Sequence, residues 1–389
     1  MRITRITYGE APIASRIANA VIDFSRMTVS IVAVHTDLVV DGEPVVGYGF
    51  HSNGRYAQSG ILADRVLPRV REAAPERLLD PGTGVIDPVA VRAVAMENEK
   101  PGGHGDRAVA VGTLDMAMWD LAAKAEGLPL YRLLHRRFGT APEPASSVWV
   151  YAAGGYYHPD KPIEGLCREI RGYLDLGYRD VKIKIGGAPL AEDRRRIEAV
   201  LDLLPAGSRL AVDANGRFDL PTALEYARAL TDYDLMWYEE PVDPLDYLGH
   251  AALAESYPGA LATGENLFSA ADVRNLRRHA GLRPGLDVLQ MDPSLSYGVA
   301  EYAAMLGDLA QAGWSPRQVC PHGGNQINLA MAAAFGFGGC ESYPEVFQPF
   351  GGFAESTPVR DGRVALPDAP GLGVELKPVL HSLLREHLH

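Results

Sequence analysis

Between residues 184 and 322, ionisable residues recur at nearly constant spacing along the chain. Six such residues follow one another at intervals of 29, 26, 26, 27 and 30 positions, namely Lys184, Asp213, Glu239, Glu265, Asp292 and His322. Each stands at the end of a short apolar run that is typical of a buried strand, and helical patterns separate the runs. One strand–helix unit of a (β/α)8 barrel takes about 30 residues, because roughly 250 residues make eight units. The spacing therefore predicts a barrel with six ionisable groups at one rim.

The expected strands number eight, and the helical patterns between them indicate a parallel sheet. The strands are expected at 147–151, 179–185, 209–213, 235–239, 261–265, 287–292, 318–322 and around 336–341. The chain before them has another texture. It shows strand patterns at 28–35 and 44–50 around an Asp41-Gly42 turn, helical spacing at 61–80 and 88–98, and a long helix at 106–126 ended by Gly127.

Composition excludes several classes of protein. Only 37 lysines and arginines stand against 49 aspartates and glutamates, a net charge of −12, which argues against binding nucleic acid or an anionic membrane. No apolar run approaches the ~20 residues of a membrane span, and the first residues show no apolar signal segment. The three cysteines are too few and too scattered for a disulfide framework or a zinc site. We therefore expect a soluble cytoplasmic protein.

Three successive expected strands end in the carboxylates Asp213, Glu239 and Glu265. Three carboxylates at one rim would repel one another, and a divalent cation relieves that repulsion. Oxygen ligands alone select a hard ion, so the pattern predicts a Mg²⁺ site. The alternative is three separately solvated carboxylates at the starts of loops, and their equal spacing favours the metal.

The other recurring groups can move protons. Lys182 and Lys184 lie two residues apart, so both point to one side of their strand. Crowding of the two ammonium groups and the metal is expected to lower the pKa of one of them. Such a lysine can serve as a general base. An exposed lysine pair on an edge strand is the alternative. Asp292 and His322 end neighbouring strands, where the carboxylate would orient the imidazole, although His322 could merely cap a turn.

Six ordered motifs carry a family resemblance over nearly the whole chain. They are Lys182-Ile-Lys184, Val212-Asp-Ala-Asn215, Tyr238-Glu-Glu-Pro241, Gly264-Glu-Asn266, Gln290-Met-Asp292 and Cys320-Pro-His322-Gly323. Together with the helix around 114–124 and the stretch 127–131, they resemble the mandelate racemase subgroup of the enolase superfamily. The resemblance implies a barrel over 140–355 and an α+β capping domain over 1–135 with part of 355–389. Members use Mg²⁺ and a Lys or His base to form an ene-diolate.

The resemblance also implies roles for individual residues. Asp213, Glu239 and Glu265 would hold Mg²⁺, and Lys184 would take the proton α to a substrate carboxylate. His322, oriented by Asp292, would be the second acid/base group. Substrate or metal-shell contacts would come from Lys182 to the substrate carboxylate, from Glu341 as a possible hydrogen-bond donor, and from Asn215.

Within the subgroup, the chain is most similar to acid-sugar dehydratases that act on tartrate, which implies conversion of D-tartrate to oxaloacetate by a hydro-lyase. The absence of lysine between Lys184 and Lys377 disfavours the branch that uses opposed lysines. Three alternatives stay open: another acid sugar, a racemase or epimerase reaction, and a homologue that binds without catalysis. Lys100 and Arg55 are candidate cations for the substrate, with a flexible surface loop as the alternative for each. Family analogy also implies a homo-oligomer.

Overall fold

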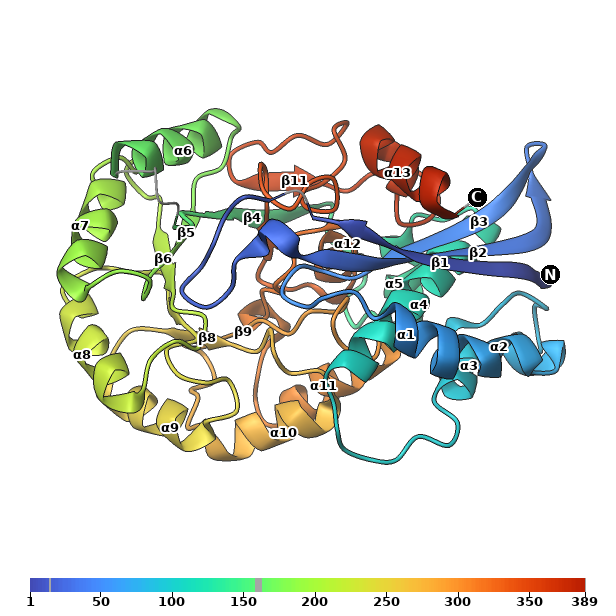
Figure 1. Cartoon of the computed structure of the whole chain (residues 1–389), viewed down its shortest axis with the longest axis horizontal. Helices are drawn as coiled ribbons and strands as arrows, with labels where there is room; N and C mark the ends of the chain where they lie inside the picture. Colours follow the sequence, from blue (N-terminus) through green and yellow to red (C-terminus); the bar gives the residue numbers. More distant parts are fainter. Residues whose placement is uncertain (14, 158–162, 389) are drawn as a thin grey trace.

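The computed structural model describes residues 1–13, 15–157 and 163–388. A curled parallel sheet with helices outside it occupies one side of the molecule, and a three-stranded sheet with its own helices occupies the other (Figure 1). The parallel strands run in the order β10-β4-β5-β6-β7-β8-β9. Their bounds are β4 Ser147–Gly154, β5 Val181–Lys184, β6 Leu210–Asp213, β7 Tyr238–Glu239, β8 Leu261–Thr263, β9 Val288–Leu289 and β10 Cys340–Ser342.

The ring closes through the seventh expected strand, which is reduced to a single bridge. Val319 pairs in parallel with Leu289, and its carbonyl accepts a hydrogen bond from Gly338 N. Two prolines explain why no longer strand forms: Pro316 begins a 3-10 turn, and Pro321 has no N–H to donate to a ladder. The predicted (β/α)8-type barrel is confirmed, with an irregular seventh position.

The barrel register brings the ends of neighbouring strands side by side. Lys184 is the ladder partner of Asp213, and Asp213 is the ladder partner of Glu239. The spacing of the ionisable groups along the chain thus becomes contact across the sheet. The helices that follow the strands are α6 Ile163–Asp175, α7 Leu190–Leu201, α8 Leu220–Leu230, α9 Tyr247–Ser256, α10 Ala270–His279, α11 Val299–Gln311 and α12 Gln326–Phe335.

The second sheet is antiparallel, in the order β1-β2-β3. Its strands are β1 Ile3–Pro12, β2 Thr28–Val40 and β3 Glu43–Phe50. The predicted Asp41-Gly42 turn joins β2 and β3, and both of its residues have positive φ. Helix α4, Asp106–Ala125, packs on β3. Gly49 permits this contact, because a Cβ there would lie 2.2 Å from the carbonyl oxygen of Thr113. The predicted helix at 106–126 is confirmed, and Gly127 follows it with φ +64.

The helical region predicted at 61–80 is broken into short pieces. It comprises α1 Ser59–Ile61, a π-helical turn η2 Leu62–Val66, α2 Leu67–Glu72 and the 3-10 turn η3 Pro75–Leu78. Pro68 and Pro75 account for the breaks, because neither residue can donate a helical hydrogen bond. The remaining helices of this half are η1 Phe24–Arg26, α3 Pro88–Ala95 and α5 Leu130–Phe138.

The end of the chain returns to both sheets. Strand β11, Arg363–Ala365, pairs antiparallel with β4, and after the turn η5, Val374–Leu376, helix α13, Pro378–Leu388, packs against β1. Thr7 Oγ1 donates a hydrogen bond to the carbonyl of Leu388 at 2.7 Å. One buried apolar cluster extends from the antiparallel sheet through the barrel. Within the described residues, none of the helices is long and apolar enough to cross a bilayer.

Candidate active site

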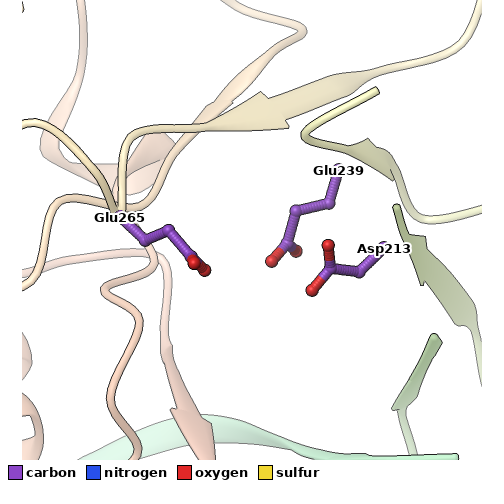
Figure 2. A group of neighbouring side chains, drawn as sticks. All are labelled: Asp213, Glu239 and Glu265. Atoms are coloured by element: carbon purple, nitrogen blue, oxygen red, sulfur yellow. The ribbon is translucent and has the colours of Figure 1, made fainter. Parts of the chain in front are cut away.

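Three carboxylates meet at the rim of the barrel. Asp213 ends β6, Glu239 ends β7, and Glu265 follows β8 by two residues. One oxygen of each lies within 4.8 Å of an oxygen of the other two, and Figure 2 shows the three side chains directed toward one another. Burial and the neighbouring Asp213 raise the pKa of Glu239 to about 8, as expected for negative charges crowded together away from water. A set of carboxylate oxygens at this separation fits a hard divalent cation.

Two buried ammonium groups contact these carboxylates. Lys184 Nζ lies 2.5 Å from Asp213 Oδ2, and Lys182 Nζ lies 2.5 Å from Glu239 Oε1 and 2.8 Å from Glu341 Oε1. Burial alone would lower the pKa of each lysine, but the adjacent carboxylates outweigh it and raise both pKa values. The spacing showed the crowding of the lysines but not their direct carboxylate partners, which act in the opposite direction on the pKa. The lowered pKa that the sequence predicts for a lysine beside a bound metal stays a prediction.

His322 and Asp292 form the expected pair. His322 Nδ1 lies 3.0 Å from Asp292 Oδ2, while Nε2 lies 3.7 Å from Glu265 Oε2. Burial would lower the pKa of His322, yet the carboxylates of Glu265, Glu341 and Asp292 raise it to about 10. These carboxylates favour the imidazolium form, which can donate a proton.

Both proton-carrying groups line one cavity of about 250 Å³. Lys184 and His322 reach it from the second and seventh positions of the barrel ring, and Glu265 and Asn215 also line it. The antiparallel half of the molecule covers the same cavity with Asn19, Phe24, Asn53 and Arg55. The site thus lies where the two halves meet.

Six of the expected site residues do not line this cavity: the metal-ligand candidates Asp213 and Glu239, and Lys182, Glu341, Asp292 and Lys100. Lys182 and Glu341 are fully buried and paired with each other. Burial would raise the pKa of Glu341, but Lys182 and His322 lower it to about 2, so in this arrangement the carboxylate accepts hydrogen bonds. Its expected role as a donor to the substrate carboxylate stays a prediction. Gly323 N donates to Glu341 Oε2 at 3.0 Å. Lys100 is exposed and apart from the cavity.

The sequence analysis assigned no role to Tyr156, Glu240 or Asn266, which also line the cavity. The ring centroid of Tyr156 lies 5.1 Å from Lys184 Nζ. Asn266 Nδ2 donates to both oxygens of Glu240 at 3.0 Å, and its Oδ1 accepts from Arg55 Nη2. Their positions just after barrel strands could have indicated these three residues, because Tyr156 follows β4 and the others follow Glu239 and Glu265 directly.

Comparison with known proteins assigns the chain to a family. The family described as "Enolase C-terminal domain-like" matches residues 165–379. The L-talarate/galactarate dehydratase of Salmonella typhimurium is 31% identical over 335 residues, which are 85% of this chain and 77% of that protein. The arabinonate dehydratase of Saccharolobus solfataricus is 29% identical over 71% of this chain and 72% of its own length.

A solved structure agrees along nearly the whole chain. The L-talarate dehydratase from Polaromonas sp., complexed with Mg and L-glucarate, superposes with a TM-score of 0.77 at 28% identity and covers 96% of this chain and 94% of its own. The family match spans more than half of the chain, and the motifs that carried the resemblance meet in one site. The chain belongs to the enolase/mandelate racemase superfamily.

Proposed function

We propose that this protein is a Mg²⁺-dependent dehydratase of acid sugars. The observation that carries the proposal is one cavity lined by Lys184, by His322 and by Glu265 of the three-carboxylate group. Its relatives named above are dehydratases of talarate, galactarate and arabinonate. Asp213, Glu239 and Glu265 would hold the ion.

Dehydration needs a base for the α-carbon and an acid for the leaving hydroxyl. Lys184 Nζ takes the proton α to the carboxylate as a neutral amine, after its ammonium proton has passed to solvent in the cavity and its contact with Asp213 is released. The electrons of the broken C–H bond form the C=C bond, and the β C–O bond breaks. His322 Nε2 supplies the proton with which the hydroxyl leaves as water, and the enol product tautomerises to a 2-keto acid. Bound Mg²⁺ would stabilise the negative charge that develops on the substrate carboxylate.

The rest of the site holds these two groups in place. Asp292 keeps the Nδ1 side of His322 occupied, so Nε2 faces the reacting hydroxyl. Lys182 forms a buried ion pair with Glu341 beneath the rim. Its ammonium group also lies close to Glu239 and Asp213. We propose that Lys182 and Asn215 assist binding of the substrate carboxylate.

For the individual substrate, we propose D-tartrate as the first candidate. A C4 dianion needs a cation for its second carboxylate, and Arg55 lines the cavity whereas Lys100 does not. The named relatives act on longer acid sugars, so galactarate, talarate and arabinonate are the direct competitors. We also keep as proposals the division into a cap (1–135 with part of 355–389) and a barrel (140–355), the cytoplasmic location and the homo-oligomer.

The test is a screen of acid sugars with Mg²⁺, read by formation of 2-keto acids. Wild type is compared with Lys184→Ala and with Arg278→Ala, which removes an exposed cation on α10. Oxaloacetate from D-tartrate, lost only in Lys184→Ala, supports the whole proposal. Turnover of longer acid sugars alone keeps the reaction and rejects D-tartrate. If no keto acid forms, solvent deuterium incorporation at the α-carbon separates a racemase from a protein that only binds.

A further inference from the structure

A chain of buried hydrogen bonds continues from the Asp292–His322 pair into the antiparallel half of the molecule. Asp292 Oδ1 accepts from the backbone N–H of Ser294 at 2.8 Å and from its hydroxyl at 2.7 Å. Ser294 Oγ lies 2.5 Å from Ser52 Oγ, and Ser52 Oγ accepts from Asn325 Nδ2 at 3.1 Å. All five side chains are buried, and none is more than 4% exposed.

The chemistry of the groups fixes the direction of every bond. The Ser294 hydroxyl has one proton, and Asp292 receives it, so Ser52 must donate to Ser294. An amide NH₂ only donates, so Ser52 accepts from Asn325. Every donor in the chain therefore points toward the Asp292 carboxylate, and hydrogen bonds aligned in this way strengthen one another. Asp292 in turn holds the Nδ1 proton of His322.

The surrounding backbone is shaped for this contact. Gly323 has φ +109, and a Cβ there would lie 2.4 Å from Ser52 Oγ and 2.5 Å from Asp292 Oδ2. A side chain at this position would push the two groups away. Asn325 is fixed as well, because its Oδ1 accepts from Ile327 N at 3.1 Å at the start of α12.

Ser52 belongs to the segment His51–Tyr56, which follows β3 and contributes Asn53 and Arg55 to the lining of the cavity. We infer that Ser52 and Ser294 are positioning residues for His322. The segment 51–56 thus orients the proton donor only when it is packed against the barrel. This inference rests on the proposed function for its catalytic consequence.

The first experiment separates the two proton-transfer groups. Ser52→Ala and Ser294→Ala are compared with wild type and with Ser296→Ala. Ser296 is buried two residues after Ser294, and its hydroxyl donates to the Pro293 carbonyl at 3.4 Å. For dehydration, kcat should fall about 10- to 100-fold in the first two variants. KM and Lys184-dependent deuterium exchange at the α-carbon should change by less than about threefold. Equal losses of exchange and dehydration, or losses no larger than those of Ser296→Ala, would overturn the inference.

The second experiment needs no turnover. Protein labelled with ¹⁵N in its histidine rings and held with Mg²⁺ reports the Nδ1–H proton of His322, assigned with His322→Asn. Exchange of this proton with solvent should be about tenfold faster in Ser52→Ala and Ser294→Ala than in wild type or Ser296→Ala. Identical exchange rates in all four proteins would reject the positioning role. If the rates differ as expected while no acid sugar is turned over, the proposed function fails and the positioning role stands.

Discussion

The two sides of the cavity hold their proton-carrying groups by different means. Lys184 is held by an ion pair with Asp213, its ladder partner on the next barrel strand. His322 is held by the Asp292 carboxylate, which in turn accepts from the neutral hydroxyl of Ser294. Ser294 contacts Ser52, which comes from outside the barrel. The lysine side therefore depends on the barrel alone, whereas the histidine side depends on how the two halves of the molecule meet. Substitutions should act through charge on the first side and through orientation on the second.

The sharpest test of this contrast removes each proton-carrying group in turn. Lys184→Ala should abolish both dehydration and α-proton exchange, because the base acts first. His322→Asn should lower dehydration to a similar degree but leave exchange by Lys184 in place. General acid/base groups contribute roughly 10²- to 10⁴-fold, so each loss should be about 10³-fold. The measurement is a parallel assay of 2-keto acid and of deuterium incorporation, and loss of exchange in His322→Asn would contradict separate roles.

Metal removal should affect both sides, because Glu265 belongs to the carboxylate group and also lies 3.7 Å from His322 Nε2. Chelation should stop dehydration and exchange together, and added Mg²⁺ should restore both. Glu265→Gln should weaken Mg²⁺ binding about 100-fold, measured by calorimetry. Glu301→Gln is the control, since Glu301 is a carboxylate of the same type on α11 that pairs with Arg92. Unchanged Mg²⁺ affinity in Glu265→Gln would remove this residue from the ligand set.

The difference between the two sides also explains what the sequence could predict. Lys184, Asp213 and Glu239 were predictable because a parallel barrel repeats with a nearly constant period, and its register turns that period into contact. The seventh strand was predicted too long, since two prolines leave it a single bridge. The carboxylate partner of each lysine was not predictable, because spacing gives proximity and not the partner of each ammonium.

The residues that the antiparallel half contributes to the site do not recur at a constant spacing along the chain. Ser52 and Ser294 are 242 residues apart, and serine is too common for its position to signal a contact. Lys100 and Arg55 looked equivalent as cations near glycines, yet only Arg55 lines the cavity. Which loop residue reaches a site depends on how two packed halves fit, and that fit is set by many weak side-chain contacts rather than by a repeat.

Buried His51 should make the free energy of unfolding fall as the pH is lowered. His51 is fully buried and its Nδ1 contacts the Ser52 carbonyl at 2.7 Å; burial lowers its pKa from 6.5 to about 4. Above pH 6.5 the ring is neutral in the folded and unfolded states. As the pH falls from 6.5 to 4, only the unfolded state takes up the proton, so stability falls by up to about 3 kcal/mol.

Denaturant unfolding at pH 7 and pH 4.5 measures this loss. His51→Gln keeps a hydrogen-bond donor but cannot titrate, so its stability should fall less than that of wild type over the same interval. His279→Gln, which changes an exposed histidine on α10, should behave as wild type. Equal pH dependence in wild type and His51→Gln would show that this ring does not couple pH to the segment 51–56.

Arg55 should give the smallest effect and the most specific one. Its guanidinium lies 5.1 Å from the Phe268 ring centroid and donates to Asn266, so it ties the segment 51–56 to the barrel beside Glu265. Arg55→Lys keeps the charge but loses the planar fork, and we expect KM to rise about tenfold with a smaller change in kcat. Arg55→Lys should affect dicarboxylate substrates more than monocarboxylates if the guanidinium binds the second carboxylate. An equal rise in KM for both classes would instead assign Arg55 to seating the segment, and would place recognition of the substrate's far end on the barrel side of the cavity.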